Sequence, residues 1–279
     1  MSISHVLPIL DLSGRQEDPR RYLAGRKSMG LQDKVVVVTG GGRGIGQGIA
    51  YHLAQHGARL AIIDVNAATI EETVSRIGIR AKGYVCDITN ESAVENCFAE
   101  IAGDFGAIHG LVNNAGIIRD GLMVKVRDGK VVSKLSLEDF DKVMNVCLKG
   151  AFLCAREAVA HMLAGDGSDR AIVNISSGSF RGNYGQTNYS AAKAGLVAMS
   201  RVWAKEYGRY GIRSMVIAPG AVDTDLLRSM PAEGLKALAA QIPLRRIGQI
   251  ENIAMAAAHI LANDYLTGSI LEVNGGMVV

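Results

Sequence analysis

The sequence predicts an α/β fold, in which helices cover both faces of one doubly wound, mostly parallel sheet. From residue 34 onward, short apolar runs alternate with segments of helical periodicity. The first run, Val35–Val38, is β-branched throughout, as is typical of a parallel strand buried on both faces. A glycine-rich segment follows this run at once, and 33 of the 279 residues are glycine, well above the usual share of about 7%.

The other elements continue the same alternation. Ile45, Ile49 and Leu53 recur at the four-residue spacing of a helix that follows the glycines. We expect strands at 35–38, 60–63, 83–86, 108–112, 171–175, 213–217 and 270–273. We expect helices at 45–56, 67–77, 91–103, near 138–163, 189–207 and 251–262. Since no linker or repeat interrupts this series, we expect residues 31–279 to form one domain.

Two segments depart from the alternation. Apolar residues flank Asp128-Gly129, a two-residue hairpin signal, so a β-hairpin is expected to be inserted at about 122–134. Such a hairpin is a surface decoration, a rim over a binding site or a subunit contact. The stretch of about 222–247 is punctuated by prolines and a glycine and predicts a substrate lid.

Composition excludes several classes of protein. The formal net charge of +3 is too small to indicate a nucleic-acid or membrane-surface partner, and no run approaches the ~18 apolar residues of a membrane helix. The four cysteines form no C-x-x-C pair, so we expect free thiols and a cytoplasmic location. His52 and His56 share a helix face without a third ligand, so no metal site is expected. Residues 1–30 are expected to form an arm on the domain or on a partner subunit.

The segment Thr39–Gly46 joins the first strand to the first helix. Glycine lets the backbone approach a ligand closely, and the N-terminal end of the following helix attracts a pyrophosphate. Asp64 ends the next strand, 18 residues after Gly46, near the spacing of about 20 typical of a carboxylate that accepts ribose hydroxyls. These features predict dinucleotide binding.

Asp64 and Arg43 bear on the choice of dinucleotide. A carboxylate repels the 2′-phosphate of NADP, whereas a guanidinium attracts it. We give Asp64 more weight, because a close like-charge contact is costly and Arg43 can turn to solvent. The sequence therefore favours NAD(H) over NADP(H).

Tyr189 and Lys193 lie four residues apart at the start of a predicted helix, which puts them on one face. An ammonium beside a phenol favours the phenolate, so Tyr189 can act as general acid and base between a ketone and an alcohol. Ser177 follows the strand at 171–175, at the edge of the sheet where ligands bind, and can donate to the substrate oxygen. Taken singly, these residues are equally well explained as surface neighbours and a turn serine.

In combination, these motifs resemble the short-chain dehydrogenase/reductase family. The glycine loop, Asn113-Asn114-Ala115-Gly116, Ser177, Tyr189-x-x-x-Lys193 and Pro219-Gly220 occur in the family's order, from about residue 32 to 279. The resemblance implies a Rossmann-type sheet, a nicotinamide cofactor, hydride transfer at a carbonyl carbon and a homotetramer or homodimer. It implies catalysis by Ser177, Tyr189 and Lys193. The residues that it places at the cofactor are Gly40, Arg43, Gly44, Ile45, Gly46, Asp64, Val65, Cys86, Asp87, Ile88, Asn114, Ala115, Gly116, Tyr189, Lys193, Pro219, Gly220, Val222 and Thr224.

Within the family, the run after Asn113 and the run Gly185–Tyr189 are similar to the 3-oxoacyl-acyl-carrier-protein reductase branch. This resemblance implies a small-molecule or acyl-thioester substrate. Another small ketone or alcohol is the alternative substrate. A dinucleotide-binding sensor without catalysis is the alternative of another class.

The sequence departs from the family pattern in two places. Cys147 stands where the family has an asparagine that anchors a water in the proton relay, and Asn145 lies about 200° away round the helix. Tyr189 follows Ser177 by 12 residues and Ser176 by 13, and the longer spacing is common in the family. We choose Ser177 because it matches the second serine of the motif that ends at that position.

Overall fold

The computed structural model describes residues 30–165 and 169–277. A seven-stranded sheet has the order β3-β2-β1-β4-β7-β8-β9, and every neighbouring pair is parallel. The strands are β1 (Val35–Thr39), β2 (Arg59–Asp64), β3 (Ala81–Val85), β4 (Gly110–Asn113), β7 (Arg170–Ile175), β8 (Ile212–Pro219) and β9 (Ile270–Val273). The strand order reverses between β1 and β4, at the switch point where such sheets bind ligands. This arrangement confirms the predicted fold class.

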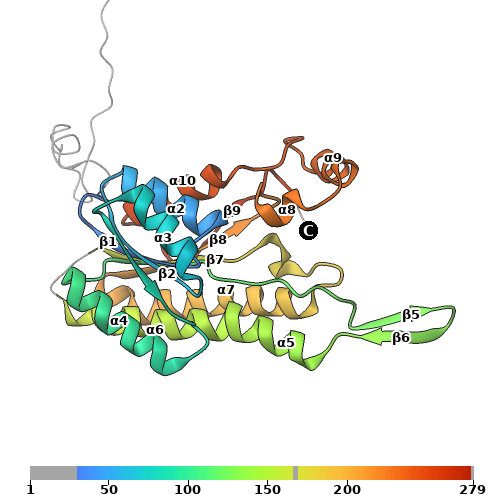
Figure 1. Ribbon diagram of the computed structural model, residues 1–279, viewed down its shortest axis with the longest axis horizontal. Helices are drawn as coiled ribbons and strands as arrows, with labels where there is room; N and C mark the ends of the chain where they lie inside the picture. The colour runs from blue at the N-terminus through green and yellow to red at the C-terminus, as the bar shows by residue number, and fades with distance from the viewer. Residues whose placement is uncertain (1–29, 166–168, 278–279) are drawn as a thin grey trace, which may run out of the picture. The chain divides into compact units, whose positions relative to one another are not determined.

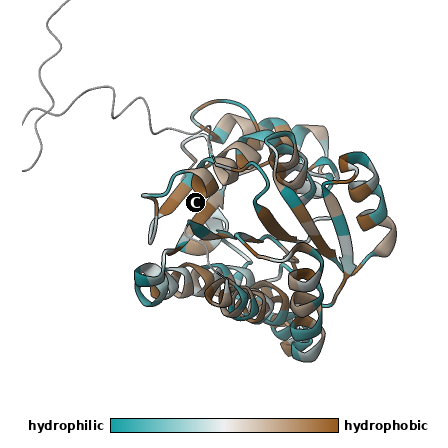
Figure 2. Ribbon diagram, turned by 90° about the vertical axis from the view of Figure 1, so that its left-hand side faces the viewer, coloured by the Kyte–Doolittle hydropathy of each residue, from teal (hydrophilic) through white to brown (hydrophobic). Residues whose placement is uncertain are grey.

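Helices cover both faces of the sheet (Figure 1). On one face lie α2 (Gly44–Gln55), α3 (Ala67–Ile77) and α10 (Ile250–Ala262), and on the other lie α4 (Glu91–Phe105), α6 (Ala151–Ala164) and α7 (Thr187–Tyr207). Alternate residues of each strand enter opposite layers. Val36 and Val38 pack in the cluster with α2 and α10, whereas Val37 packs in the cluster with α4 and α6. Both clusters need apolar side chains, which is why the central strands are mostly apolar and carry much of the brown of Figure 2.

The helix expected near 138–163 is interrupted. It consists of α5 (Leu137–Met144), a π-helical turn η1 (Asn145–Gly150) and α6. Ser136 caps α5 by accepting a hydrogen bond from the Asp139 N–H at 3.0 Å. At the other end of the π turn, a Cβ on Gly150 would lie 2.7 Å from the Ile88 side chain, so the close contact between this turn and Ile88 favours glycine.

A two-stranded hairpin leaves the body beyond α5 (Figure 1). It consists of β5 (Val124–Arg127) and β6 (Lys130–Lys134), paired antiparallel. The intervening Asp128 and Gly129 have φ of 51° and 72°. Two positive φ angles in a two-residue loop match the right-handed twist of the strands, and Asp-Gly favours this turn.

The stretch expected to be a lid contains two short helices, α8 (Asp225–Arg228) and α9 (Ala232–Gln241). None of the described helices combines the length and apolarity needed to cross a bilayer. Residues 1–29 of the predicted arm lie outside the described residues.

Candidate active site

The glycine loop and the Asn-Asn-Ala-Gly turn are hydrogen-bonded to each other at the ends of β1 and β4. The Asn114 side-chain amide donates to the carbonyls of Thr39 and Gly40, both at 3.1 Å. In return, the Thr39 hydroxyl accepts from the N–H groups of Asn114 at 3.0 Å and Ala115 at 3.1 Å. Two motifs that are 75 residues apart in the sequence therefore form one rigid edge.

Gly46 lets α2 begin directly against this edge. A Cβ at Gly46 would lie 2.2 Å from the Gly40 carbonyl oxygen and 2.4 Å from the Asn114 side-chain nitrogen. Neither contact is compatible with a side chain. The N-terminal end of α2, with the free N–H groups that suit a phosphate, is thus fixed beside the ends of β1 and β4. Ile45, next to Gly46 in the first turn, is half-buried.

Asp64 lies against the same loop from the end of β2. One carboxylate oxygen accepts from the Gly42 N–H at 3.1 Å, and the other accepts from Val65 at 2.8 Å and Asn66 at 3.3 Å. The Val65 side chain is exposed. The fold thus brings Asp64, as its spacing from Gly46 predicts, into contact with the glycine loop.

The segment after β3 forms the next part of this edge. Cys86 and Ile88 are buried, while Asp87 between them is exposed and accepts from the Thr89 N–H at 2.9 Å. Ile88 is also the residue that packs on Gly150 at the end of the π turn. The segment Cys86-Asp87-Ile88, which the sequence places at the adenine, therefore lies next to the π turn.

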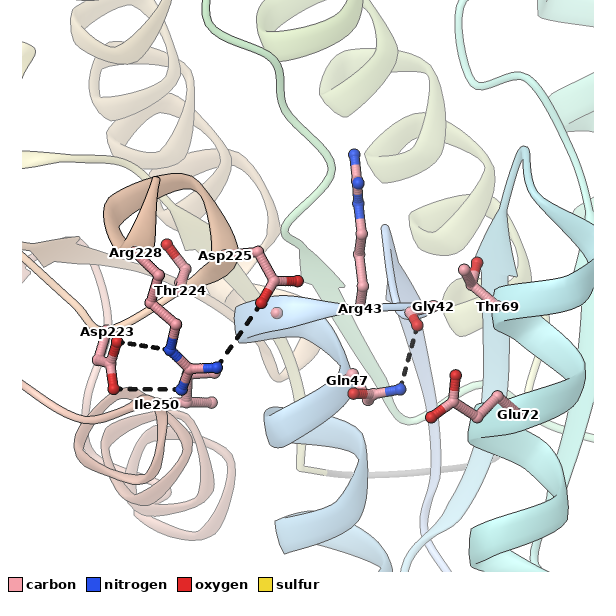
Figure 3. A pocket seen from close by; sticks show the side chains of 11 residues that line it. Gly42, Arg43, Gln47, Thr69, Glu72, Asp223, Thr224, Asp225, Arg228 and Ile250 are labelled. Atoms are coloured by element: carbon pink, nitrogen blue, oxygen red, sulfur yellow. Dashed lines mark hydrogen bonds and ion pairs between the residues drawn. The ribbon is translucent and has the colours of Figure 1, made fainter. Parts of the chain in front are cut away.

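A pocket of about 430 Å³ joins the glycine loop to the lid stretch (Figure 3). Gly44 and Thr224 are among its lining residues. The Arg228 guanidinium donates to both Asp223 carboxylate oxygens, at 2.8 and 3.1 Å, and this hydrogen bonding lowers the pKa of the Asp223 carboxyl. The exposed Arg43 side chain extends away from this ion pair (Figure 3). The lid stretch thus lies beside the loop that is expected to hold phosphates.

The chemistry-bearing pair lies on α7. Lys193 is buried, and its ammonium donates to the Ile175 carbonyl at 2.8 Å. The same ammonium is 5.5 Å from the centre of the Tyr189 ring. The four-residue spacing therefore places both side chains on one helix face, next to the end of β7.

The two serines after β7 are used differently. Ser176 is buried, and its hydroxyl donates to the Lys193 carbonyl at 3.1 Å, which attaches α7 to the strand. Ser177 is half-buried, and its hydroxyl accepts from the Ser179 N–H at 3.2 Å. Because the Ser177 oxygen is the acceptor in this hydrogen bond, the proton of its hydroxyl is available to another acceptor. This geometry favours Ser177 as the donor to a substrate oxygen.

Cys147 lies inside the π turn and is buried. Its sulfur accepts from the Ile117 N–H at 3.4 Å and donates to the Ile117 carbonyl at 3.5 Å. A Cβ at Gly116 would lie 3.4 Å from this sulfur and 3.6 Å from the Lys193 nitrogen. The thiol and the ammonium therefore flank the same turn, so Cys147 belongs to the candidate site.

Comparison with known proteins decides the family. The family model described as enoyl-(acyl carrier protein) reductase matches residues 40–278. An acetoacetyl-CoA reductase of Synechocystis is 38% identical over 251 residues, covering 89% of this chain and 98% of that protein. A human 3-oxoacyl-[acyl-carrier-protein] reductase is 39% identical over 246 residues, covering 88% and 98%. The chain belongs to the short-chain dehydrogenase/reductase family.

A solved structure supports the same assignment. It comes from Agrobacterium tumefaciens, is described provisionally as a gluconate dehydrogenase and is 30% identical to this chain. Its TM-score is 0.82, and the match covers 91% of this chain and 99% of the other. As a member of the family, the protein is an oxidoreductase that interconverts a carbonyl group and an alcohol with a nicotinamide dinucleotide.

The remaining cofactor candidates lie at the end of β8. Pro219 is buried, and Gly220 approaches Asn274 so closely that a Cβ would lie 2.8 Å from its Cα. Val222 is buried and forms a β-bridge with Gly248. Among the described residues, no group of three or more His, Cys, Asp or Glu side chains is placed to hold a metal ion.

Sequence reasoning missed two residues of the site. Ile117 is hydrogen-bonded to Cys147 through its backbone N–H and carbonyl, which no side-chain pattern signals. Asn188 is fully buried, and its amide donates to the carbonyls of Arg119 at 2.9 Å and Asp139 at 3.3 Å. An asparagine directly before Tyr189 was a detectable signal, but its partners are distant in the sequence.

The geometry of Cys147 yields a test. We expect Cys147→Asn to leave kcat equal or higher, because an amide offers Ile117 the same donor and acceptor as the thiol, in stronger form. Cys147→Ala leaves both Ile117 groups without their partner, and losing about 1 kcal/mol of positioning lowers kcat about fivefold. Steady-state kinetics at saturating substrate measures this.

Cys154→Ala is the matched control, because Cys154 is equally buried but packs in the cluster of α4 and α6. It should leave kcat unchanged. A large loss of kcat in Cys147→Asn would contradict the interpretation and would show that the thiol has a role of its own.

Proposed function

We propose that the enzyme interconverts 3-oxoacyl and 3-hydroxyacyl thioesters and uses NAD(H). One observation carries the proposal: Tyr189 and Lys193 lie together on α7 beside the end of β7, and Ser177 follows that strand, in a chain whose relatives are named for acetoacetyl-CoA and 3-oxoacyl-[acyl-carrier-protein] reduction. These relatives match over 98% of their own length, so the similarity extends through the segments after β7. The solved gluconate dehydrogenase relative makes another small alcohol the competing substrate class.

The glycine loop and its neighbours would hold the dinucleotide. The close approach of Gly46 to Gly40 leaves room for backbone only, which suits a pyrophosphate at the start of α2. Asp64 would accept the ribose hydroxyls, Asp87 would meet the adenine edge and Pro219 to Thr224 would hold the nicotinamide end. When bound, the dinucleotide supplies or accepts the hydride.

The chain's own residues move the proton and hold the oxygen. In the reductive direction, the Tyr189 hydroxyl gives its proton to the carbonyl oxygen as the carbon gains the hydride. In the oxidative direction, the Tyr189 phenolate removes the proton from the alcohol. The Ser177 hydroxyl donates a hydrogen bond to the same oxygen and stabilises the negative charge that develops there.

Lys193 lies beside Tyr189. Its ammonium is held by the Ile175 carbonyl at 2.8 Å and lies 5.5 Å from the centre of the phenol ring, where a cation would stabilise negative charge that develops on the phenol oxygen during proton transfer. Ser176 holds the backbone of Lys193. Cytoplasmic location and assembly as a homotetramer or homodimer remain predictions of the sequence.

The direct test follows the absorbance of NADH with acetoacetyl-CoA as substrate. We expect turnover, and we expect Tyr189→Phe to lower kcat at least about a hundredfold, because it removes the acid and base. Ser177→Ala should also lower kcat about a hundredfold, which is the usual effect of removing one donor to an oxyanion. Ser176→Ala should retain most of the activity.

Tyr184→Phe is the control, because Tyr184 is exposed in the loop before α7. A panel of ketones and alcohols, gluconate included, is assayed in parallel. If the enzyme turns over only a different substrate, the proposed substrate class changes to that of the new substrate. Tight NADH binding without any turnover would favour a sensor, and full activity of Ser177→Ala with loss in Ser176→Ala would exchange the roles of the serines.

The cofactor preference gives a separate prediction. We expect a lower KM for NAD(H) than for NADP(H), since two like charges 4 Å apart repel by about 4 kcal/mol at an effective dielectric constant of 20. Asp64→Asn keeps an acceptor for the Gly42 N–H but loses the charge, and should raise kcat/KM for NADPH relative to NADH at least tenfold. Comparable KM values for both cofactors in the wild type would contradict this prediction. A large fall in kcat/KM for NADPH in Arg43→Ala would show that Arg43 influences the cofactor preference more than Asp64 does.

A further inference from the structure

The hairpin of β5 and β6 is exposed along its whole length. Every residue of both strands is accessible to solvent, including four valines that are 42 to 58% exposed. An isolated two-stranded hairpin is marginally stable in water. An arm of this kind, held away from the body (Figure 1), gains stability from a partner that covers it.

The register divides the hairpin into a basic face and an apolar face. Lys125 pairs with Ser133 and Arg127 pairs with Lys130, so the cations Lys125, Arg127 and Lys130 share one face. Val124 and Val126 lie on the opposite face, which they share with their cross-strand partners Lys134 and Val131. The bulge between Lys125 and Val126 accommodates the extra residue on the facing strand.

The basic face lacks counter-charges. Within the part of the chain that the structure describes, none of its three cations takes part in an ion pair. Arg127 and Lys130 are direct cross-strand neighbours, and like charges in this position destabilise a hairpin. The hairpin strands carry four basic residues with a single aspartate at the turn, and this excess equals the formal net charge of +3 of the whole chain. An acidic partner surface removes the repulsion.

The base of the hairpin is attached to the active site. The Asn188 amide donates to the carbonyl of Arg119 before the hairpin and of Asp139 after it. Gln186 donates to the Asp120 carboxylate at 2.8 Å, and the Gly121 N–H donates to the Gly185 carbonyl at 2.8 Å. Asn188 directly precedes Tyr189 and accepts from its N–H at 2.8 Å. A partner on the hairpin is therefore held beside the segment that leads to Tyr189.

We propose that the hairpin Val124–Lys134 is a docking arm for an acidic carrier protein that presents the acyl thioester. This inference rests on the proposed function. The basic face supplies charge complementarity, and the exposed valines of the opposite face are available for a separate apolar contact. Hairpin-to-hairpin contact between two copies of the chain is a poorer alternative, because two hairpins of the same sign repel each other.

The test compares one acyl group on two carriers. The wild type is assayed with acetoacetyl-acyl-carrier protein and with acetoacetyl-N-acetylcysteamine, a neutral thioester without a protein, and we expect it to reduce both. We expect Lys125→Gln/Arg127→Gln/Lys130→Gln to lower kcat/KM at least tenfold for the carrier-bound substrate and to leave the small thioester unchanged. The salt dependence of kcat/KM for the carrier-bound substrate should weaken in parallel, since exposed charges are screened.

Arg201→Gln/Lys205→Gln/Arg209→Gln is the matched control, with three exposed cations near the far end of α7. This control should leave kcat/KM unchanged for both substrates. Equal kcat/KM of the hairpin variant and the wild type for the carrier-bound substrate overturns the docking arm and leaves the proposed function intact. A wild type that reduces neither thioester overturns both. A hairpin variant whose oligomeric state changes in analytical ultracentrifugation assigns the hairpin to a contact between copies instead.

Discussion

The structure of the site depends on how closely α2 can approach the ends of β1 and β4. The Gly40 carbonyl and the Asn114 amide occupy the space where a side chain of Gly46 would be, at 2.2 and 2.4 Å from its Cβ position. The four hydrogen bonds between Thr39, Gly40, Asn114 and Ala115 keep this edge closed. Because the edge is rigid, the end of α2 and the carboxylate of Asp64 have one defined position relative to each other.

The catalytic half is connected to this edge through the interior of the sheet. A buried hydrogen bond of 3.0 Å joins Asn113 in β4 to Asn174 in β7. From the end of β7, Ser176 and the Ile175 carbonyl hold Lys193. On the other side of Gly116, Cys147 is hydrogen-bonded to the backbone of Ile117. The proposed dinucleotide side and the proposed proton-transfer side are thus aligned by buried polar contacts, which are costly to break.

Much of this arrangement could be predicted from the sequence, because the relevant signals are local. The β-branched run of β1, the Asp-Gly turn of the hairpin and the spacing of Tyr189 and Lys193 each depend on neighbouring residues. Contacts between distant segments could not be predicted. The π turn has no periodic signature in the sequence, and its last residue, Gly150, packs on the distant Ile88. The different use of Ser176 and Ser177 depends on where α7 lies.

The importance of the close approach of α2 is tested most directly by the affinity of Gly46→Ala for NADH, measured by isothermal titration calorimetry. A methyl group there forces α2 away from Gly40 and Asn114, so we expect the Kd for NADH to rise at least tenfold. Gly103→Ala is the control, because Gly103 is exposed in α4 and a Cβ there meets no atom within 4 Å. An unchanged Kd in Gly46→Ala, with the fold intact by circular dichroism, would contradict the claim that this close approach builds the cofactor site.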